Sequence, residues 1–325
     1  MSSLSTTRRP TRLSQRLERA PAHPLLTLWS QVEWRVDPSA GPAADWIAGG
    51  LEGIVNSPTG ITTIKTGPHR TVYRARTRRG EFFVKHYHPV GWWNWLKHFA
   101  RRTRAEHERD LAHWLTARGI PTITPLAVGL RRHLGSPCES LLVMPAIPGV
   151  PLDDHCRQQC RGLVGRELAA WRQGLARALG RFLGELHREG GDHRDLHAGN
   201  VLVEATPAGP RLHLIDLQAL HRGDHLSTAS RRGNLANFHQ FFVGLSTQSD
   251  RLRFWRAYLT VQPGSWGEST RHSVADWFAL TNGWPITNPA AHPLQQEIAR
   301  RLEDDLVHQA RVGWERADQI GRAHV

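Results

Sequence analysis

One short segment carries two carboxylates and an amide at a spacing that suits phosphoryl transfer. Asp195 follows His193 and Arg194, Asn200 lies five residues after Asp195, and Asp216 ends the next predicted hairpin strand. Phosphoryl transfer to a hydroxyl needs a carboxylate that orients the nucleophile and accepts its proton, and oxygen ligands that hold a metal on the phosphates. The pattern predicts a kinase-type catalytic loop, with Asp195 as the base and Asn200 and Asp216 as Mg²⁺ ligands.

Two other interpretations of this segment are weaker. Asp195 and Asn200 could simply cap a turn, but the spacing and the strand-turn-strand context favour catalysis. His193 and His197 lie four residues apart, as zinc-binding histidines on a helix do, but Leu196 stands between them and the glutamate of a metalloprotease is absent.

Upstream, Lys85 lies on a predicted strand, where a kinase places the lysine that neutralises the α- and β-phosphates of ATP. That lysine needs an acidic partner on the following helix, and both Glu106 and Glu108 are available. We favour Glu108, because Leu111 and Leu115 place it at the edge of an apolar stripe that should face the sheet. Glu106 is then expected to be solvated.

The loop expected to cover the phosphates, residues 66–72, contains one glycine, Gly67, followed by a proline. Kinases commonly use several glycines there, because backbone N–H groups must approach the phosphates. His69 and Arg70 are the two candidates that could supply the missing positive charge through a side chain. Adenine is expected next to Met144 and Ala146, at a Pro-Gly-rich connection that reads as a hinge.

The elements that must position these residues can be read from periodicity and turn residues. Three short strands form a meander, a helix ends at Gly119 with Pro121 beyond it, and two more strands precede the hinge. After the hinge, apolar residues spaced by three and four mark a long amphipathic helix, and two short strands flank residues 206–210. The expected ranges are 61–65, 71–76 and 81–87 (strands), 95–118 (helix), 126–130 and 140–144 (strands), 168–186 (helix), 201–203 and 212–215 (strands), with a mostly helical remainder.

Composition limits the choice of partner and compartment. The 325 residues are 39% apolar, enough for an ordinary core, and Lys and Arg exceed Asp and Glu by 13 charges, which favours a polyanionic partner. Three cysteines form no disulfide framework. No secretory signal and no membrane span can be read, so we expect a cytoplasmic protein. Three tryptophans, Trp92, Trp93 and Trp95, beside basic residues favour either a peripheral contact at the inner membrane or a packed aromatic cluster.

Over about residues 60–245 the order of these parts resembles the protein-kinase-like superfamily, and within it the lipopolysaccharide kinase family. The segments that carry the resemblance are Gly119–Thr122, His193–Asp195, Ile215–Gln218 and Arg231–Phe238. The resemblance implies an α+β, bilobal, protein-kinase-like fold: a small antiparallel sheet with one helix, then a mainly helical lobe. It also implies ATP and Mg²⁺ as cofactors and a sugar hydroxyl of lipopolysaccharide or a related anionic glycolipid as acceptor, and it places His193 and Arg194 in the catalytic set, His193 bracing the loop.

The chain departs from its relatives at three points. Gln218 stands where protein kinases have a metal-site glycine, no Ala-Pro-Glu follows, and Asn200 stands where the heptose kinases of the family carry histidine. The acceptor sugar therefore stays open. Four alternatives remain: a small-molecule phosphotransferase of the aminoglycoside or choline type, a protein kinase, a non-catalytic kinase-fold binding module, and a nucleic-acid-binding protein. No motif supports the last of these, and we expect no specific nucleic-acid partner.

The sequence thus predicts four segments. Residues 1–45 are expected to form a basic, flexible extension, residues 46–145 the small lobe and residues 146–319 the large lobe. Residues 320–325 resemble a translated sequencing adapter and are expected to be a non-native tail.

Overall fold

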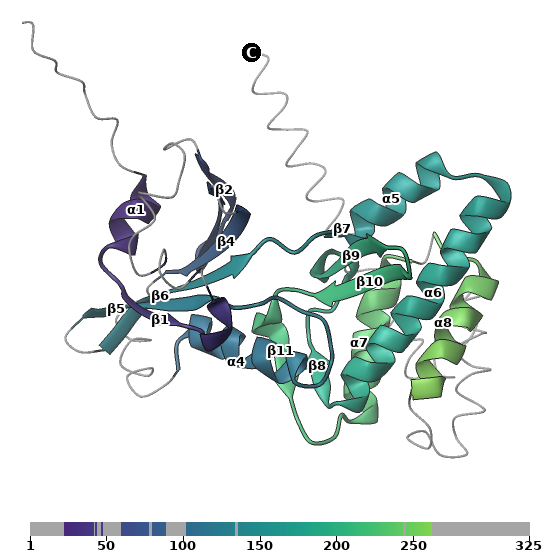
Figure 1. Ribbon diagram of the computed structural model, residues 1–325. Helices are drawn as coiled ribbons and strands as arrows, with labels where there is room; N and C mark the ends of the chain where they lie inside the picture. The colour runs from purple at the N-terminus through teal and green to yellow at the C-terminus, as the bar shows by residue number, and fades with distance from the viewer. Residues whose placement is uncertain are drawn as a thin grey trace, which may run out of the picture.

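The computed structural model describes residues 23–41, 43, 47, 60–77, 80–88, 102–133, 136–242 and 245–261. In these ranges the chain forms two lobes, one built around a sheet and the other mainly of helices (Figure 1). The predicted α+β, two-lobed architecture is confirmed. None of the helices in these ranges has both the length and the apolar character needed to cross a membrane.

The small lobe is built on a six-stranded sheet in the order β1-β5-β6-β4-β3-β2, and every pairing in it is antiparallel. In β4, near the middle of the sheet, successive side chains point to opposite faces, so Lys85 and Tyr87 share the face toward the large lobe while Phe82 and Val84 pack into a separate core cluster. The strands are β1 Glu33–Val36, β2 Ile61–Thr66, β3 Arg70–Thr77, β4 Gly80–Tyr87, β5 Ala127–His133 and β6 Ser136–Pro145.

Helix α4, Arg104–Thr116, packs against β4, β5 and β6. Its start differs from the expected residue 95. Thr103 caps the helix by accepting from the Glu106 N–H, while the Glu106 side chain accepts from the Thr103 N–H, and this reciprocal cap stops the helix from extending backward. Glu106 is therefore a capping residue and not a merely solvated one. The three tryptophans at positions 92, 93 and 95 lie outside the described residues.

The N-terminal segment differs from the predicted flexible extension, because its described part is folded onto the small lobe. Helix α1, Pro24–Trp29, strand β1 and the 3₁₀ turn η1, Pro38–Ala40, belong to the small lobe, and β1 pairs with β5. Leu25, Leu28 and Trp29 are buried in the same core cluster as Val84. The stretch is rich in Arg, Pro and Ser, but α1 gathers these three apolar residues on one side, so they can pack into the core. Residues 1–22 lie outside the described ranges.

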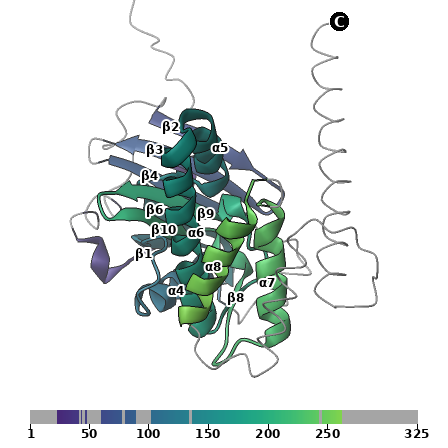
Figure 2. The same cartoon turned by 90° about the vertical axis from the view of Figure 1, so that its right-hand side faces the viewer.

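The large lobe is dominated by α6, Gly165–Arg188, which carries the predicted apolar stripe. Helix α8 packs along it (Figure 2), and Gly180 and Gly184 let the backbone of α8 approach closely. The other helices are α5, Leu152–Gly162, and α7, Thr228–Gln240; α8 itself spans Gln248–Val261. Cys138, Cys156 and Cys160 are all free thiols.

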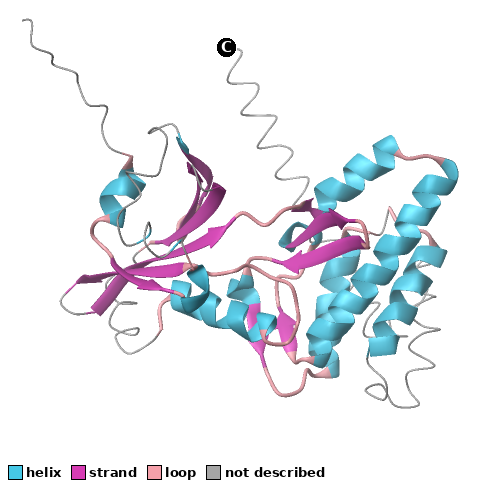
Figure 3. Cartoon of the chain, viewed as in Figure 1, coloured by secondary structure: helices cyan, strands magenta, loops and turns pink. Residues whose placement is uncertain are grey.

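Short strands connect this helical body to the small lobe (Figure 3). One three-stranded sheet has the order β10-β9-β7, and β11 pairs with β8. A continuous apolar core runs from Tyr87 and Leu115 in the small lobe to Leu183 and Leu212 in the large one. The short elements are β7 Val150–Pro151, β8 Gly191–His193, η4 Ala198–Asn200, β9 Val201–Thr206, β10 Gly209–Leu214, η5 Leu217–Ala219 and β11 Leu220–Arg222.

Candidate active site

Asp195 lies in the exposed turn that follows β8, and 70% of its side chain is accessible. The backbone beside it is fixed from behind, because the Arg194 N–H donates to the Ala219 carbonyl at 3.0 Å and the Asn237 amide donates to the Arg194 carbonyl at 3.2 Å. A solvent-facing carboxylate on a fixed backbone can receive a proton from a substrate hydroxyl without a rearrangement of the fold.

Asn200 and Asp216 lie at the ends of neighbouring segments, since the Ile215 N–H donates to the Asn200 carbonyl at 2.9 Å. The Asn200 amide nitrogen donates to the Asp195 carbonyl at 2.8 Å, which leaves its side-chain oxygen for a cation. Asp216 is the one non-glycine residue with positive φ (58°) within the described ranges. A carboxylate and an amide oxygen are the hard ligands that Mg²⁺ prefers, so these residues fit the predicted metal site.

Arg70, the first residue of β3, reaches across to the large lobe and binds Asp216. Its Nη1 and Nη2 atoms donate to Oδ1 and Oδ2 of that carboxylate at 2.7 and 2.9 Å. Burial alone would raise the pKa of Asp216, but the bonds from Arg70 and the charge of Lys85 outweigh it and lower that pKa to about 2. The carboxylate is therefore ionised. Arg70, one of the two residues considered for the phosphate loop, therefore lies in the site.

Lys85 contacts Glu108 of α4, and Glu108 is completely buried. The Tyr87 hydroxyl donates to the other oxygen of the same carboxylate. Burial raises the pKa of Tyr87 well above its usual value, and the negative charge of Glu108 raises it further, so the phenol stays a donor. Glu108 is thus held by two side chains of β4, and it fixes the position of Lys85, the residue that the sequence predicts to hold the α- and β-phosphates of ATP.

Asn234 of α7 holds the start of the catalytic loop. Its Oδ1 accepts from the His193 N–H at 2.9 Å, and its Nδ2 donates to Asp192 at 2.8 Å. The ring of His187, fully buried in α6, contacts the same Oδ1 through Nε2 at 3.4 Å and the Tyr258 hydroxyl through Nδ1 at 2.8 Å. Burial lowers the pKa of His187 to about 4, so the ring is neutral, with its proton on Nε2 facing Asn234.

His193 braces the loop and does not face the acceptor. The residue is completely buried, and its Nε2 donates to the Asp216 carbonyl at 3.1 Å, which helps to hold Asp216 in its left-handed conformation. Its place in the catalytic set is therefore a supporting one. Arg194 points outward, with 67% of its side chain exposed.

His197 uses Nδ1 to accept from the Gly199 N–H, and its Nε2 lies 3.8 Å from Asp195. His193 is buried while the side chain of His197 is half exposed, so the two rings do not share a metal site. Within the described ranges no group of three His, Cys, Asp or Glu side chains is placed to hold a metal.

Three further residues predicted to contact the nucleotide, Gly67, Met144 and Ala146, have surroundings that say little about nucleotide binding. An added Cβ at Gly67 would meet only the Arg70 carbonyl oxygen at 3.6 Å, an ordinary contact. The side chain of Met144 is buried beside the site, on β6 opposite Phe83. The Ala146 N–H donates to the Glu81 carbonyl at 2.9 Å, so it is not free to bind adenine. The position of adenine beside Met144 and Ala146 therefore stays a prediction, which an N–H donor at Ala146 does not support.

Sequence reasoning missed three of the residues that build this site. Tyr87 could have been found, because it lies two residues after Lys85 on the same strand and therefore on the same face. Asn234 lies in the Arg231–Phe238 segment that the family resemblance marks, but its role depends on a contact 41 residues away in sequence. His187 gives no local signal, because its spacing on α6 is that of an ordinary core position.

Comparison with known proteins gives a consistent result. The family model described as lipopolysaccharide kinase (Kdo/WaaP) family matches residues 65–258. A 3-deoxy-D-manno-octulosonic acid kinase of Xylella fastidiosa is 37% identical over 103 residues, which is 32% of this chain and 37% of that relative. The lipopolysaccharide core heptose(I) kinase WaaP of Pseudomonas aeruginosa is 28% identical over 206 residues, or 58% of this chain and 75% of that relative.

Among solved structures, one described as WaaP in complex with acyl carrier protein matches with a TM-score of 0.55 at 20% identity. The match covers 76% of this chain and 96% of that one, and it confirms the predicted fold. The chain spans little more than a third of the length of the Xylella relatives that it matches.

Proposed function

The chain belongs to the lipopolysaccharide kinase (Kdo/WaaP) family, and from this premise we propose that it is an ATP- and Mg²⁺-dependent kinase of a lipopolysaccharide core sugar. The observation that carries the proposal is the exposed Asp195 carboxylate on a braced loop, together with the Asn200 and Asp216 oxygens and the Lys85–Glu108 pair. We place the protein in the cytoplasm, where ATP is supplied.

Each residue of the candidate active site has its own role in phosphoryl transfer. Bound ATP supplies the γ-phosphoryl group, and Mg²⁺ neutralises the phosphates. Lys85, oriented by Glu108 and Tyr87, holds the α- and β-phosphates. Asn200 and Asp216 hold the metal, and Asp195 orients the acceptor hydroxyl and takes its proton. His193 and Asn234 keep the loop in place but do not touch the substrate.

The acceptor class follows from charge and from the relatives. The chain carries a net charge of +13, which favours an anionic acceptor over the cationic acceptors of aminoglycoside-type enzymes. Arg194, exposed beside Asp195, adds positive charge where the acceptor must bind. The matched relatives are named for a heptose and for an octulosonic acid. We propose a sugar of the lipopolysaccharide core, on a glycolipid that the protein reaches from the inner face of the membrane.

The proposal is tested by following labelled phosphate from ATP, with Mg²⁺, into purified core lipopolysaccharides that contain or lack each sugar. Wild type and Asp195→Asn are compared, because the amide keeps the size of the side chain but cannot accept the proton. Labelling of one lipopolysaccharide that falls by about 10²-fold or more in the variant supports the proposal. Labelling of soluble aminoglycosides or sugars instead would assign the small-molecule class, and ATP binding without transfer to anything would assign a binding module.

A second partner is suggested by an apolar pocket in the large lobe. The pocket lies between α5, α6, α7 and α8 and is partly open to solvent. Its walls include Trp171, Leu175, Leu179, Phe238 and Phe254. Because the WaaP structure that matches this fold contains acyl carrier protein, we propose that the pocket receives an acyl chain delivered by such a carrier.

Ala176 lines this pocket, and replacing it with Phe would fill part of the space. Arg177, the next residue on α6, is exposed and serves as the control site for Arg177→Ala. We expect Ala176→Phe to lose co-elution with acyl-loaded carrier while the control keeps it and both variants melt like wild type. Equal binding of acyl-loaded and unloaded carrier, or no binding by wild type, would contradict the proposal.

A further inference from the structure

Strand β1 is fixed firmly to the edge of the small-lobe sheet. Trp34 lies across β5 at Gly129, where an added Cβ would come within 2.9 Å of the indole. The ring centroids of Trp29 and Trp34 lie 4.2 Å apart, and the Trp34 Nε1–H donates to the Trp29 carbonyl at 3.2 Å. At the end of the strand, the Asp37 N–H donates to the Leu126 carbonyl at 2.7 Å. Residues Glu33–Asp37, called the N-terminal strap below, therefore have a defined position.

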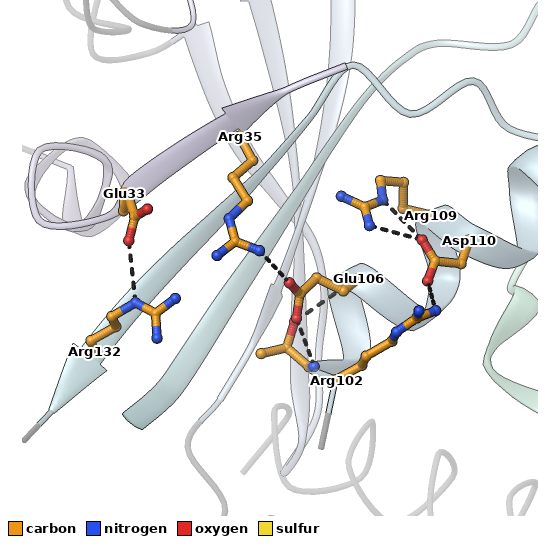
Figure 4. A network of polar contacts seen from close by, with 8 residues as sticks. Glu33, Arg35, Arg102, Glu106, Arg109, Asp110 and Arg132 are labelled. Atoms are coloured by element: carbon orange, nitrogen blue, oxygen red, sulfur yellow. Dashed lines mark hydrogen bonds and ion pairs between the residues drawn. The ribbon is translucent and has the colours of Figure 1, made fainter. Parts of the chain in front are cut away.

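The strap is joined to α4 by one ion pair and by one contact between a carboxylate and a histidine ring. Arg35 Nη1 lies 2.9 Å from Glu106 Oε1 in the first turn of the helix, as Figure 4 shows. Asp37 Oδ2 lies 2.8 Å from His113 Nε2 near the other end. Glu106 and His113 are seven residues apart, which is about two turns of a helix, so both point to one side of α4.

The opposite side of α4 carries the buried residues that face the sheet and the catalytic site. Glu108, Leu111 and Leu115 are all at most 2% exposed. The helix is therefore held on two sides, by the sheet and core on one and by the strap on the other. Because Glu108 must stay in contact with Lys85 for the phosphates to be held, a rotation or shift of α4 would remove the lysine's partner.

We propose that Arg35 and Asp37 are positioning residues, which act through α4 to hold Glu108 against Lys85. In this arrangement the N-terminal strap of the chain itself holds α4 in place. Lys85 and Glu108 then meet without a separate activating event. This inference rests on the proposed kinase activity, but its test needs nucleotide alone and no acceptor.

The burial of the two contacts between the strap and α4 predicts that removing them changes nucleotide affinity by a measurable amount. Exposed ion pairs contribute little on average, but here the acidic side chains are largely buried, with 12% of Glu106 and 7% of Asp37 exposed. Glu106 is also held by the helix cap, so its carboxylate is already oriented toward Arg35. Each pair is expected to change nucleotide affinity by up to about fivefold.

The experiment compares Arg35→Gln, Asp37→Asn and the double variant with the conservative Arg35→Lys. The matched control is Arg132→Gln, which removes an arginine ion pair of the same sheet: Arg132 binds Glu33 of β1 at 3.2 Å, and this pair does not reach α4 (Figure 4). Three quantities are measured: the Kd of ATP with Mg²⁺ and no acceptor, amide hydrogen exchange of residues 104–116, and the melting temperature.

We expect weaker ATP binding and faster exchange within α4 for Arg35→Gln and Asp37→Asn, a larger effect in the double variant, and near-wild-type values for Arg35→Lys and Arg132→Gln. In a Glu108→Gln background, where the Lys85 pair is already lost, Arg35→Gln should weaken ATP binding no further. Lower melting temperatures with unchanged ATP affinity would show a purely structural strap and overturn the inference, as would an equal effect from Arg132→Gln. Failure to find an acceptor would refute the proposed function but leave these results intact.

Discussion

Arg70 and Asp216 form a two-bond ion pair between the lobes, with 18% and 29% of their side chains exposed. The carboxylate involved is the one proposed to hold Mg²⁺, and the arginine begins the strand that follows the phosphate-covering turn. The guanidinium of Arg70 therefore lies against the carboxylate on which the proposed Mg²⁺ would be held. Arg70 and the proposed Mg²⁺ would then compete for the same carboxylate oxygens.

Replacing Arg70 with Gln removes a cation that competes with the metal for Asp216. We expect divalent cations to bind the nucleotide-free Arg70→Gln protein more tightly, by roughly tenfold, because the carboxylate no longer carries a paired charge. Titration with Mn²⁺, followed by its electron paramagnetic resonance signal, measures this directly. Arg74→Gln, on the same strand, is the control. An unchanged or weaker Mn²⁺ affinity in Arg70→Gln would show that Arg70 does not compete with the cation.

The catalytic loop could be predicted from sequence because its chemistry depends on residues close together along the chain. Asp195, Asn200 and Asp216 are tied to one hairpin, so their spacing alone indicates their relation. The sequence leaves open whether His69 or Arg70 supplies the positive charge, because the partner of Arg70 lies 146 residues away. The capping role of Glu106 is readable from Thr103, three residues earlier, whereas the apolar pattern of the helix alone predicts a solvated residue.

The N-terminal strand could not be predicted for a different physical reason. Arg, Pro and Ser make up 16 of the first 40 residues, and β1 has only four residues. Such a strand is stable only through its partner β5 and through Trp34 over Gly129, and neither contact leaves a local pattern. The hydrogen bond from the Ala146 N–H is equally invisible in the sequence, because its acceptor, the Glu81 carbonyl, lies 65 residues upstream.

Removing the hydroxyl of Tyr87 should loosen Glu108 but keep the fold. In Tyr87→Phe the buried carboxylate loses one of its two side-chain partners, and we expect the free energy of unfolding to fall by about 1–3 kcal/mol. The Kd of ATP should rise as well, because Lys85 is less firmly oriented. Urea unfolding and ATP titration measure the two effects.

Tyr73→Phe provides the comparison for this change. Tyr73 lies on neighbouring β3, with its ring edge against His23, and it loses the same hydroxyl in a half-buried setting. We expect it to keep wild-type ATP affinity. Equal ATP affinities for Tyr87→Phe and wild type would mean that Lys85 alone fixes Glu108.

Acid should destabilise the large lobe through His187. Burial lowers the pKa of this histidine from 6.5 to about 4, so between these values the unfolded chain binds a proton that the folded chain does not. Its neutral form therefore stabilises the fold fully above pH 6.5, and this contribution is lost as pH falls toward 4, by up to about 3 kcal/mol. Urea unfolding at several pH values measures the slope.

His187→Gln should show a shallower slope over the same interval, because the glutamine does not titrate. His239, whose pKa burial also lowers to about 4, remains in that variant and keeps part of the slope. The double variant with His239→Gln should flatten it further. A slope in His187→Gln as steep as that of wild type would mean that the protonation responsible takes place elsewhere.

Two glycines of α6 should respond to alanine in opposite directions. At Gly180 an added Cβ would lie 2.2 Å from the Phe254 carbonyl oxygen, so α8 must move away, and we expect Gly180→Ala to lower the free energy of unfolding by about 3 kcal/mol. At Gly174 nothing lies within 4 Å of the added atom. There alanine only restricts the unfolded chain, and the free energy should rise by about 0.5–1 kcal/mol.

Both changes add the same methyl group to the same helix, so the gain in helix propensity is the same in both variants. The difference between their free energies of unfolding therefore measures the cost of the close approach of α6 and α8. Urea unfolding of the two variants and wild type gives that difference. The catalytic loop depends on this contact, since His187 of α6 and Tyr258 of α8 meet beneath Asn234. Gly180→Ala should therefore also speed hydrogen exchange of the His193 amide, whose acceptor is Asn234, while Gly174→Ala leaves it unchanged. Equal stabilities for the two variants would show that α8 can shift without cost and that the loop is braced by α7 alone.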